Sequence, residues 1–292
     1  MLLSLKKSIF MLLGLAVIQT YFNICSAETI VSFRHQHAVE KHYQHSALIL
    51  ALEKTVSSHG TFTMKYIKEP MNDRRARAEI LKNNFPNFVM AMAGSAEIFT
   101  RFSYAPFPIE LGLLGYRLPM HHKSNLSTFS KIKTLNELKS LRVVQGEGWH
   151  DSQILKDNGF TAVSEVNSKR FGKMLTSNRV DLFFSSLSDI NYHLSDTIVL
   201  NKKFAIFYSS PRFYIANKNN TAIIERIYKG LTLAFNDGSL LKLMDKKFAP
   251  ELLKLDASNR VIFTLKSEHI KTIDHRYFEW LNKLEPYVNT KR

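Results

Sequence analysis

Two apolar, proline-containing segments limit the fold more than any other feature of this chain. The first, FSYAPFPIELGLLGYRLP (102–119), contains three prolines, and the second, FAIFYSSPRFYIANK (204–218), contains one. Because proline fixes φ and removes a backbone donor, both segments are predicted to be extended rather than helical. Alternating strand and helix patterns flank each of them. Two extended segments between such patterns are expected when a chain crosses from a first lobe to a second and then crosses back to the first.

The flanking patterns predict an α/β fold with largely parallel sheets. Before the first segment, strands are expected at 28–33, 61–67 and 88–92, with helices at 38–58 and 72–82. Between the two segments, short helices are expected at 135–141 and 151–158, and strands at 142–145, 161–166 and 180–186. Helical spacing returns at 224–234 and 240–248, and a strand-like run follows at 260–265.

The first 27 residues predict a cleavable signal peptide. Lys6 and Lys7 precede an apolar run from Ile9 to Ile18, and small residues occupy the positions before Glu28. The run is too short for a stable membrane-spanning helix. Ile24 precedes Cys25 where a lipoprotein signal needs a small residue, so cleavage is expected after Ala27. The resulting protein is expected in the periplasm.

The predicted mature chain has no cysteine, since Cys25 is the only one in the sequence. A thiol nucleophile, a disulfide framework and a thiolate metal site are therefore excluded. Its 38 basic and 25 acidic residues give a net charge of +13, which favours anionic partners. Lysines are scattered rather than interleaved with aromatic residues, and export argues against a nucleic-acid role.

Three stretches carry a resemblance to a known family. TLNELKSLRVVQGEGW, FGKMLTSNRVDLFFSS and FYIANKNNTAIIERIYKGLTLAFNDGSLLKLMDKKF follow one another in the chain. In that order they resemble the type II periplasmic binding proteins, in particular the polar amino-acid-binding group called bacterial extracellular solute-binding protein family 3. The resemblance covers most of residues 29–249.

The resemblance implies a two-lobed clamp with two crossover segments and a ligand cleft between the lobes. The expected divisions are a signal peptide (1–27), the first part of lobe 1 (28–118), lobe 2 (119–203), the return part of lobe 1 (204–249), and a C-terminal extension packing on lobe 1 (250–292). Closure of the cleft around a solute would be the functional motion.

The loop QGEGWHD, residues 145–151, supplies candidate ligand-binding residues. Glycines allow close approach of the backbone, and the helix that follows could present free N–H groups to an anionic group. Gln145, Trp149 and His150 are the predicted contacts, with core packing of Trp149 as the alternative. Ser185 and Ser186 end an apolar strand, where they could face the cleft or cap a helix.

The family's carboxylate-binding arginine corresponds to Ala96 in this chain. Two arginines flanking the first crossing segment, Arg101 and Arg117, are therefore the predicted replacements, and a surface position is the alternative for each. The family's ammonium-binding aspartate corresponds to the serine pair 185–186, with Asp189 further along the chain.

Four histidines occur in RHQHAVEKHYQH, residues 34–45. His35 and His37 follow the first strand and are predicted to contact a ligand in the cleft. A solvated turn and a metal site are the alternatives. A metal site needs three or four imidazoles to converge, and helical spacing brings together only His42 and His45.

The sequence predicts a binding protein rather than an enzyme. It has no GxSxG, HExxH or phosphate-loop motif. The expected partners are a small polar solute, with anionic and aromatic character left open, and a membrane transporter permease or sensor. No cofactor is expected. The alternatives are a periplasmic metal carrier using the His35–His45 cluster and an enzyme on the same fold.

Overall fold

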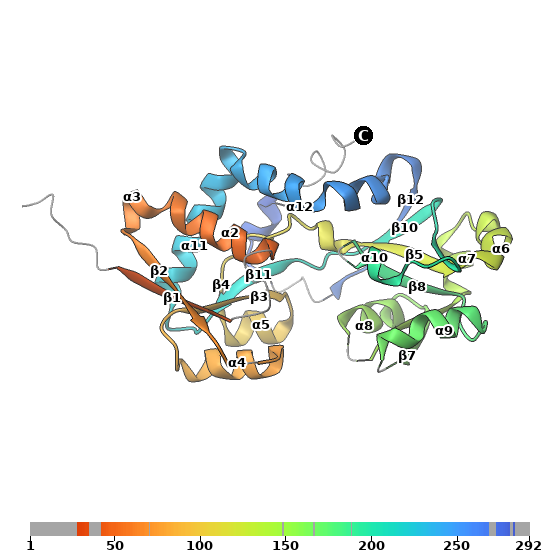
Figure 1. Cartoon of the computed structure of the whole chain (residues 1–292), viewed down its shortest axis with the longest axis horizontal. Helices are drawn as coiled ribbons and strands as arrows, with labels where there is room; N and C mark the ends of the chain where they lie inside the picture. The colour runs from red at the N-terminus through yellow and green to blue at the C-terminus, as the bar shows by residue number, and fades with distance from the viewer. Residues whose placement is uncertain are drawn as a thin grey trace, which may run out of the picture.

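The computed structural model describes residues 28–34, 42–69, 71–147, 149–165, 167–187, 189–268, 273–280 and 283. These residues form two lobes, one on each side of a central junction (Figure 1). The predicted signal peptide lies outside the described residues. Among the described residues, no helix combines the length and the apolar character needed to cross a lipid bilayer.

Lobe 1 is built on a five-stranded sheet with the order β2-β1-β3-β11-β4. Its strands are β1 (Thr29–Arg34), β2 (Phe62–Ile67), β3 (Phe88–Ala93), β4 (Ser103–Tyr104) and β11 (Arg212–Ala216). The first three are parallel, whereas β11 runs antiparallel to β3 and β4. The expected alternation is therefore observed, but the returning segment makes the sheet mixed.

Helices cover the sheet of lobe 1. They are α2 (Tyr43–Lys54), α3 (Val56–His59), α4 (Asp73–Lys82), α5 (Ala96–Arg101), α11 (Thr221–Asn236) and α12 (Ser239–Leu255). The helix expected from Ala38 begins at Tyr43, because His42 has extended backbone angles. Gly60 ends this region with φ of 76°, a conformation that glycine adopts without strain.

Lobe 2 is built on a seven-stranded sheet with the order β12-β10-β5-β8-β6-β7, and β9 pairs with β5. Its strands are β5 (Tyr116–His122), β6 (Arg142–Gly146), β7 (Thr161–Glu165), β8 (Leu182–Ser186), β9 (Ile198–Leu200), β10 (Phe204–Phe207) and β12 (Val261–Thr264). Its helices are α6 (Leu126–Lys131), α7 (Leu135–Lys139), α8 (His150–Asp157), α9 (Phe171–Thr176) and α10 (Ile190–His193). Short 3₁₀ turns occur at Leu113–Gly115, Lys123–Asn125, Ser168–Arg170 and Ala257–Asn259.

The two predicted crossing segments connect the lobes. The first runs from β4 to β5 and is largely buried, with Phe107, Ile109 and Leu113 fully enclosed. The second runs from β10 to β11. Because β10 pairs with β5, the return to lobe 1 begins after Phe207 rather than at residue 204.

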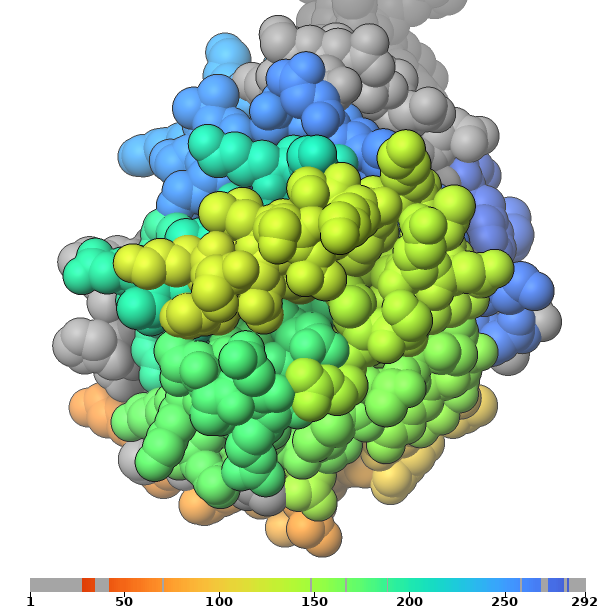
Figure 2. Space-filling view, turned by 90° about the vertical axis from the view of Figure 1, so that its right-hand side faces the viewer, coloured from red at the N-terminus to blue at the C-terminus, as the bar shows by residue number. Residues whose placement is uncertain are grey.

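The C-terminal extension differs from the expectation that it packs on lobe 1. Helix α12 does not end before Pro250 but continues to Leu255, because Leu252 and Leu255 extend its buried stripe. Strand β12 then pairs with β10 at the edge of the lobe 2 sheet. Among the residues described beyond β12, residues 273–280 return to lobe 1, where Trp280 packs on Phe107 and Phe235. Figure 2 looks onto the lobe 2 end and shows blue C-terminal atoms along its upper and right-hand edges.

Candidate functional site

Two adjoining cavities lie between the lobes. The larger, of about 590 Å³, is lined mainly by β1, α2 and β3 of lobe 1 and by Lys247 and Phe248 of α12. The smaller, of about 280 Å³, is lined mainly by α8, β8 and α10 of lobe 2. Ala93, Leu114, Asp189 and Arg212 line both cavities. The shared residues come from both lobes and from the first crossing segment, so the cavities form one interlobe cleft.

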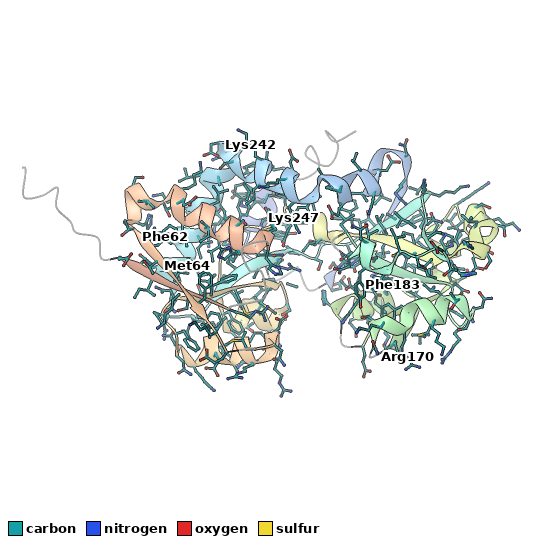
Figure 3. The ribbon with its side chains drawn as sticks, in the orientation of Figure 1. Phe62, Met64, Arg170, Phe183, Lys242 and Lys247 are labelled. Carbon is teal, nitrogen blue, oxygen red and sulfur yellow. The ribbon has the colours of Figure 1, made fainter. Side chains whose placement is uncertain are left out.

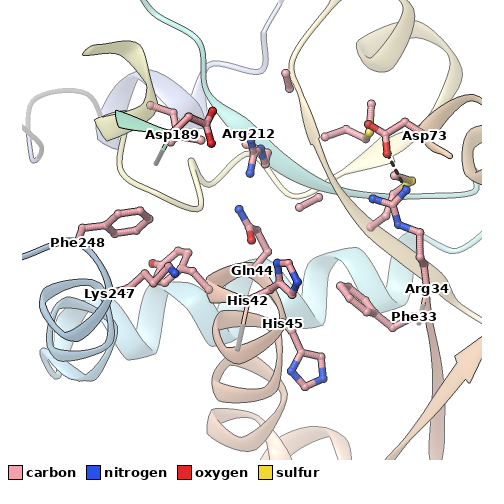
Figure 4. Close-up of a pocket in the computed structure, with 16 residues that line it drawn as sticks. Phe33, Arg34, His42, Gln44, His45, Asp73, Asp189, Arg212, Lys247 and Phe248 are labelled. Atoms are coloured by element: carbon pink, nitrogen blue, oxygen red, sulfur yellow. Dashed lines mark hydrogen bonds and ion pairs between the residues drawn. The ribbon is translucent and has the colours of Figure 1, made fainter. Parts of the chain in front are cut away.

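Arg212 is the central cation of the cleft. It begins β11, directly after Pro211, and its side chain is 34% exposed. Its guanidinium lies 3.2 Å from the carboxylate of Glu110, which also accepts a 2.8 Å hydrogen bond from the Gln44 amide. Figure 4 shows Gln44 pointing toward Arg212, with Asp189 of lobe 2 nearby. Glu110, which is itself bonded to Gln44 of α2, thus holds the Arg212 guanidinium on the lobe 1 side of the cleft.

Glu110 is almost completely buried in the first crossing segment. Burial raises the pKa of Glu110, whereas the neighbouring Arg212 and the Gln44 amide act in the opposite direction. A buried carboxylate needs such partners, because an unpaired charge in a low-dielectric environment is strongly unfavourable. The buried Glu110 carboxylate therefore holds the guanidinium of Arg212, which lines both cavities.

The indole of Trp149 forms part of the lobe 2 wall. It is 42% exposed and lies directly over Gly146, where an added Cβ would come within 2.2 Å of the ring. Its edge contacts Phe171 with a ring separation of 6.0 Å. Trp149 therefore does not plug the core, and an aromatic face remains available in the smaller cavity.

A largely buried ion pair, formed by Arg117 and Asp151, also lines the smaller cavity. Arg117 lies 2.7 Å from the carboxylate of Asp151, which also accepts a hydrogen bond from the Tyr208 hydroxyl. Arg117 donates as well to the carbonyl of Leu114 in the first crossing segment. The pair thus links the start of α8 to both crossing segments.

His150, the first residue of α8, lines the smaller cavity beside this pair. Burial lowers its pKa, with a further decrease from Arg117 and opposing effects from Asp151 and Asp157. His193 lines the same cavity, and its pKa is also lowered by burial. Both imidazoles therefore favour the neutral form, which can donate and accept hydrogen bonds.

The predicted serines occupy different environments. Ser186 lines the smaller cavity and donates a 2.6 Å hydrogen bond to Asp189. Ser185 is fully buried and donates to the carbonyl of Ser186. Gln145 is also buried, where its amide donates to the carbonyl of Phe184. Ser185 and Gln145 line neither cavity, so the expectation that they face the cleft is wrong.

The remaining predicted residues fall outside the cleft or outside the described residues. Arg101 is more than half exposed at the end of α5 and pairs with Glu97, and it lines neither cavity. His35 and His37 lie outside the described residues. Arg117, Trp149, His150 and Ser186 are the predicted residues that the structure brings together.

His42 and His45 line the larger cavity from α2. The His45 imidazole is 2.8 Å from the Tyr66 hydroxyl and packs edge-on against Phe33. Within the described part of the chain, no three histidine, cysteine, aspartate or glutamate side chains gather in a group able to hold a metal ion.

Sequence reasoning missed Glu110 and Arg212, although a signal was present. Each is flanked by apolar residues in a proline-containing segment, with Glu110 as the only acidic residue of 102–119 and Arg212 as one of two basic residues of 204–218. Two isolated opposite charges in the two segments that cross at one junction are expected to pair, since an unpaired buried charge is unfavourable. Their contact at 3.2 Å follows that rule.

Known structures with the same arrangement are numerous, although no family model and no curated protein sequence matches this chain. A probable amino-acid ABC transporter extracellular-binding protein from Bacillus subtilis aligns with a TM-score of 0.54 and 19% identity, covering 75% of this chain and 96% of that protein. An ancestral arginine-binding protein bound to arginine aligns at 0.51 and 18%, covering 76% and 98%.

The GluR0 ligand-binding core from Nostoc punctiforme, in complex with L-glutamate, aligns with a TM-score of 0.50 and 14% identity. It covers 76% of this chain and all of that core. This chain therefore has the two-lobed α/β fold of the type II periplasmic binding proteins.

Proposed function

We propose that this protein captures a small polar solute in the interlobe cleft of the periplasm and presents it to a membrane transporter or sensor. The observation that carries the proposal is the position of Arg212, a partly exposed guanidinium anchored by buried Glu110 at the meeting point of the two cavities. Asp189 lines the same place from lobe 2. A solute there would contact both lobes and favour their approach.

The charges of the cleft favour a solute that carries an anionic group. Arg212 and Lys247 line the larger cavity from two separate elements, while Arg34 is paired with Asp73 at 2.6 Å. A guanidinium donates two parallel hydrogen bonds to a carboxylate or phosphate group. Trp149, with Phe183 nearby in the smaller cavity, offers an apolar surface for the remainder of the solute.

The ligands of structural neighbours support the size of the proposed solute. One neighbour is described as bound to arginine, one is in complex with L-glutamate, and another ancestral protein is bound to glutamine. These are small polar molecules that bear a carboxylate. They support the class of solute proposed for this chain, whose sequence differs from the family pattern at Ala96 and at the serine pair 185–186.

The test is a thermal-shift panel of amino acids, organic acids, sugar acids, short peptides, Zn²⁺ and Cu²⁺, followed by calorimetry of any solute that raises Tm. A solute at a hundred times its Kd should stabilise the fold by about 2.7 kcal/mol. We expect Arg212→Gln to weaken binding about tenfold or more, since a charge-assisted hydrogen bond contributes roughly 1.5–3 kcal/mol.

Arg101→Gln is the matched control, because Arg101 lies outside the cleft and should leave affinity unchanged. Equal solute affinities of the two variants would show that Arg212 does not contact the solute. Stabilisation by Zn²⁺ or Cu²⁺ alone, reversed by chelator, would replace the proposal with a metal-carrier function.

A further inference from the structure

The C-terminal extension makes a second kind of connection between the lobes. Helix α12 starts on lobe 1 and runs toward lobe 2 along one side of the molecule (Figure 1). Figure 3 shows Lys242 on lobe 1 and Lys247, one turn later, close to the junction. With 17 residues, α12 is about 25 Å long. We call residues 239–264, from α12 to the end of β12, the interlobe bridge.

The first half of α12 is anchored in lobe 1. Leu240, Met244 and Phe248 are buried at a spacing of four residues, and all belong to the apolar core formed with α2 and α11. Phe248 packs on Tyr43 with a ring separation of 5.1 Å. These contacts hold the start of the interlobe bridge in the body of lobe 1.

The far end of α12 is anchored in lobe 2. Lys254 donates to the side-chain oxygen of Asn191 in α10. Leu252 and Leu255 belong to the same buried apolar cluster as Leu240, Met244 and Phe248, and this cluster extends to Leu187, Ile190 and Ala205 of lobe 2. One continuous helix is therefore packed on both lobes.

Arg260 fixes the C-terminal end of α12 to lobe 2. Its buried guanidinium donates to the carbonyls of Lys254 at 3.0 Å and Leu255 at 2.5 Å, which are the last two residues of α12. It also donates to the carbonyls of Asn201, which follows β9, and of Phe204, the first residue of β10. Strand β12 then pairs with β10 over four residues. Both the helix end and the following strand are thus fixed to the lobe 2 sheet.

Pro250 lies between the two anchored halves. A proline has no N–H, so α12 lacks the hydrogen bond from position 250 to the carbonyl of Lys246. The missing bond spans residues 246–250, the turn that contains Phe248 of the lobe 1 anchor and directly precedes Leu252. Bending at this position breaks fewer hydrogen bonds than bending elsewhere in the helix.

We infer that the interlobe bridge restrains closing of the cleft, and that the lobes approach each other only as α12 bends at Pro250. When the lobes rotate about the two crossing segments, their separation changes on the side of the molecule where α12 lies. Because α12 is fixed to both lobes, it resists this change. The role in solute capture rests on the proposed function. The restraint itself depends only on the contacts of α12, Arg260 and β12.

The restraint is tested without any solute by measuring the distance between spin labels. Ala78→Cys in α4 and Ser164→Cys in β7 place labels at exposed positions on the two lobes, on the side away from α12 (Figure 1). The predicted mature chain has no other cysteine. Pulsed electron–electron double resonance then gives the distance distribution of the ligand-free protein.

Two variants should change this distribution in opposite directions. Pro250→Ala restores one helical hydrogen bond and should lower the population of short distances roughly two- to tenfold. Arg260→Lys removes most of the four carbonyl contacts and should raise that population by a similar factor. Arg142→Gln, an exposed arginine paired with Asp181 within lobe 2, should leave the distribution unchanged.

Identical distributions for the wild type and Pro250→Ala would overturn the inference, because this substitution leaves both anchors intact. A change in Arg260→Lys alone would also overturn the bending step at Pro250. Absence of solute binding in the thermal-shift panel, with the expected distance changes present, would contradict the proposed function and leave the restraint standing.

Discussion

At the scale of single residues, the cleft separates residues that line its cavities from residues that support them. Arg212, Trp149, His150 and Asp189 expose functional atoms to the cavities, whereas Glu110 is buried beneath them. The sequence predicted Trp149 and His150 because they follow glycines that allow close approach of the backbone and directly precede a helix. It did not predict Arg212, because the direction of a side chain in an extended segment depends on strand register.

Trp149→Ala tests whether this indole binds solute. Since the ring is 42% exposed, its removal should lower the affinity for an identified solute about tenfold while the free energy of unfolding changes by less than about 1 kcal/mol. Phe171→Ala is the control, because Phe171 is buried beside it and should lose about 3–5 kcal/mol of stability. Urea unfolding and calorimetry measure the two quantities. The reverse pattern would assign Trp149 to the core.

His121 predicts a pH dependence of stability. It is buried on β5, stacked on Phe129 at 4.1 Å, and burial lowers its pKa below the ordinary 6.5. The unfolded chain therefore binds more protons than the folded chain as the pH falls below about 6.5, and the free energy of unfolding decreases.

His121→Phe should make this decrease smaller between about pH 7.5 and 5.5, as measured by urea unfolding at each pH. His275→Gln, at an exposed position, should behave as the wild type. A decrease of unchanged size in His121→Phe would show that other groups are responsible.

At the scale of helices and strands, the alternation of apolar runs predicted most of the elements. Strands β2, β3, β6 and β7 begin and end within about two residues of the expected positions. The predicted end of the last helix at residue 248 is wrong, because α12 continues through Pro250 to Leu255. Burial of Leu252 and Leu255 outweighs the lost hydrogen bond, and no local pattern reveals such tertiary contacts. The pairing of β12 with β10 likewise joins residues that are far apart in the sequence, so no local pattern reveals it.

Gly230 controls the packing of two central helices of lobe 1. A Cβ on this residue of α11 would lie 2.0 Å from the backbone oxygen of Ala51 in α2. Gly230→Ala should therefore destabilise the protein by about 1–3 kcal/mol, despite the better helix propensity of alanine. Gly172→Ala in α9 meets no atom within 4 Å and should raise stability by up to about 1 kcal/mol. Equal effects of the two changes in chemical unfolding would contradict the close approach.

At the scale of the whole molecule, the lobes share apolar packing. One cluster contains Val31 and Leu48 of lobe 1 together with Leu118 and Ala205 of lobe 2. The sequence predicted two lobes and two crossing segments, but not this shared core. The chain therefore resembles one cooperative unit more than two domains joined by linkers.

The two tryptophans allow this cooperativity to be measured. Trp149 lies on lobe 2, and Trp280 packs against Phe107 and Phe235 near lobe 1. Trp280→Phe and Trp149→Phe each leave one reporter. Fluorescence in urea should give one midpoint for each variant, coincident with the midpoint from circular dichroism. Separate midpoints for the two probes within one variant would indicate independent unfolding of the lobes.

The position of β12 has a consequence for protein engineering. An edge strand of the second sheet is encoded downstream of the last helix of the first lobe, so neither half corresponds to an uninterrupted gene fragment. A chimera that exchanges residues 116–207 with those of a relative would leave a foreign strand beside β10. Exchange of residues 260–265 together with that block is therefore required for a hybrid with matched side chains along this edge.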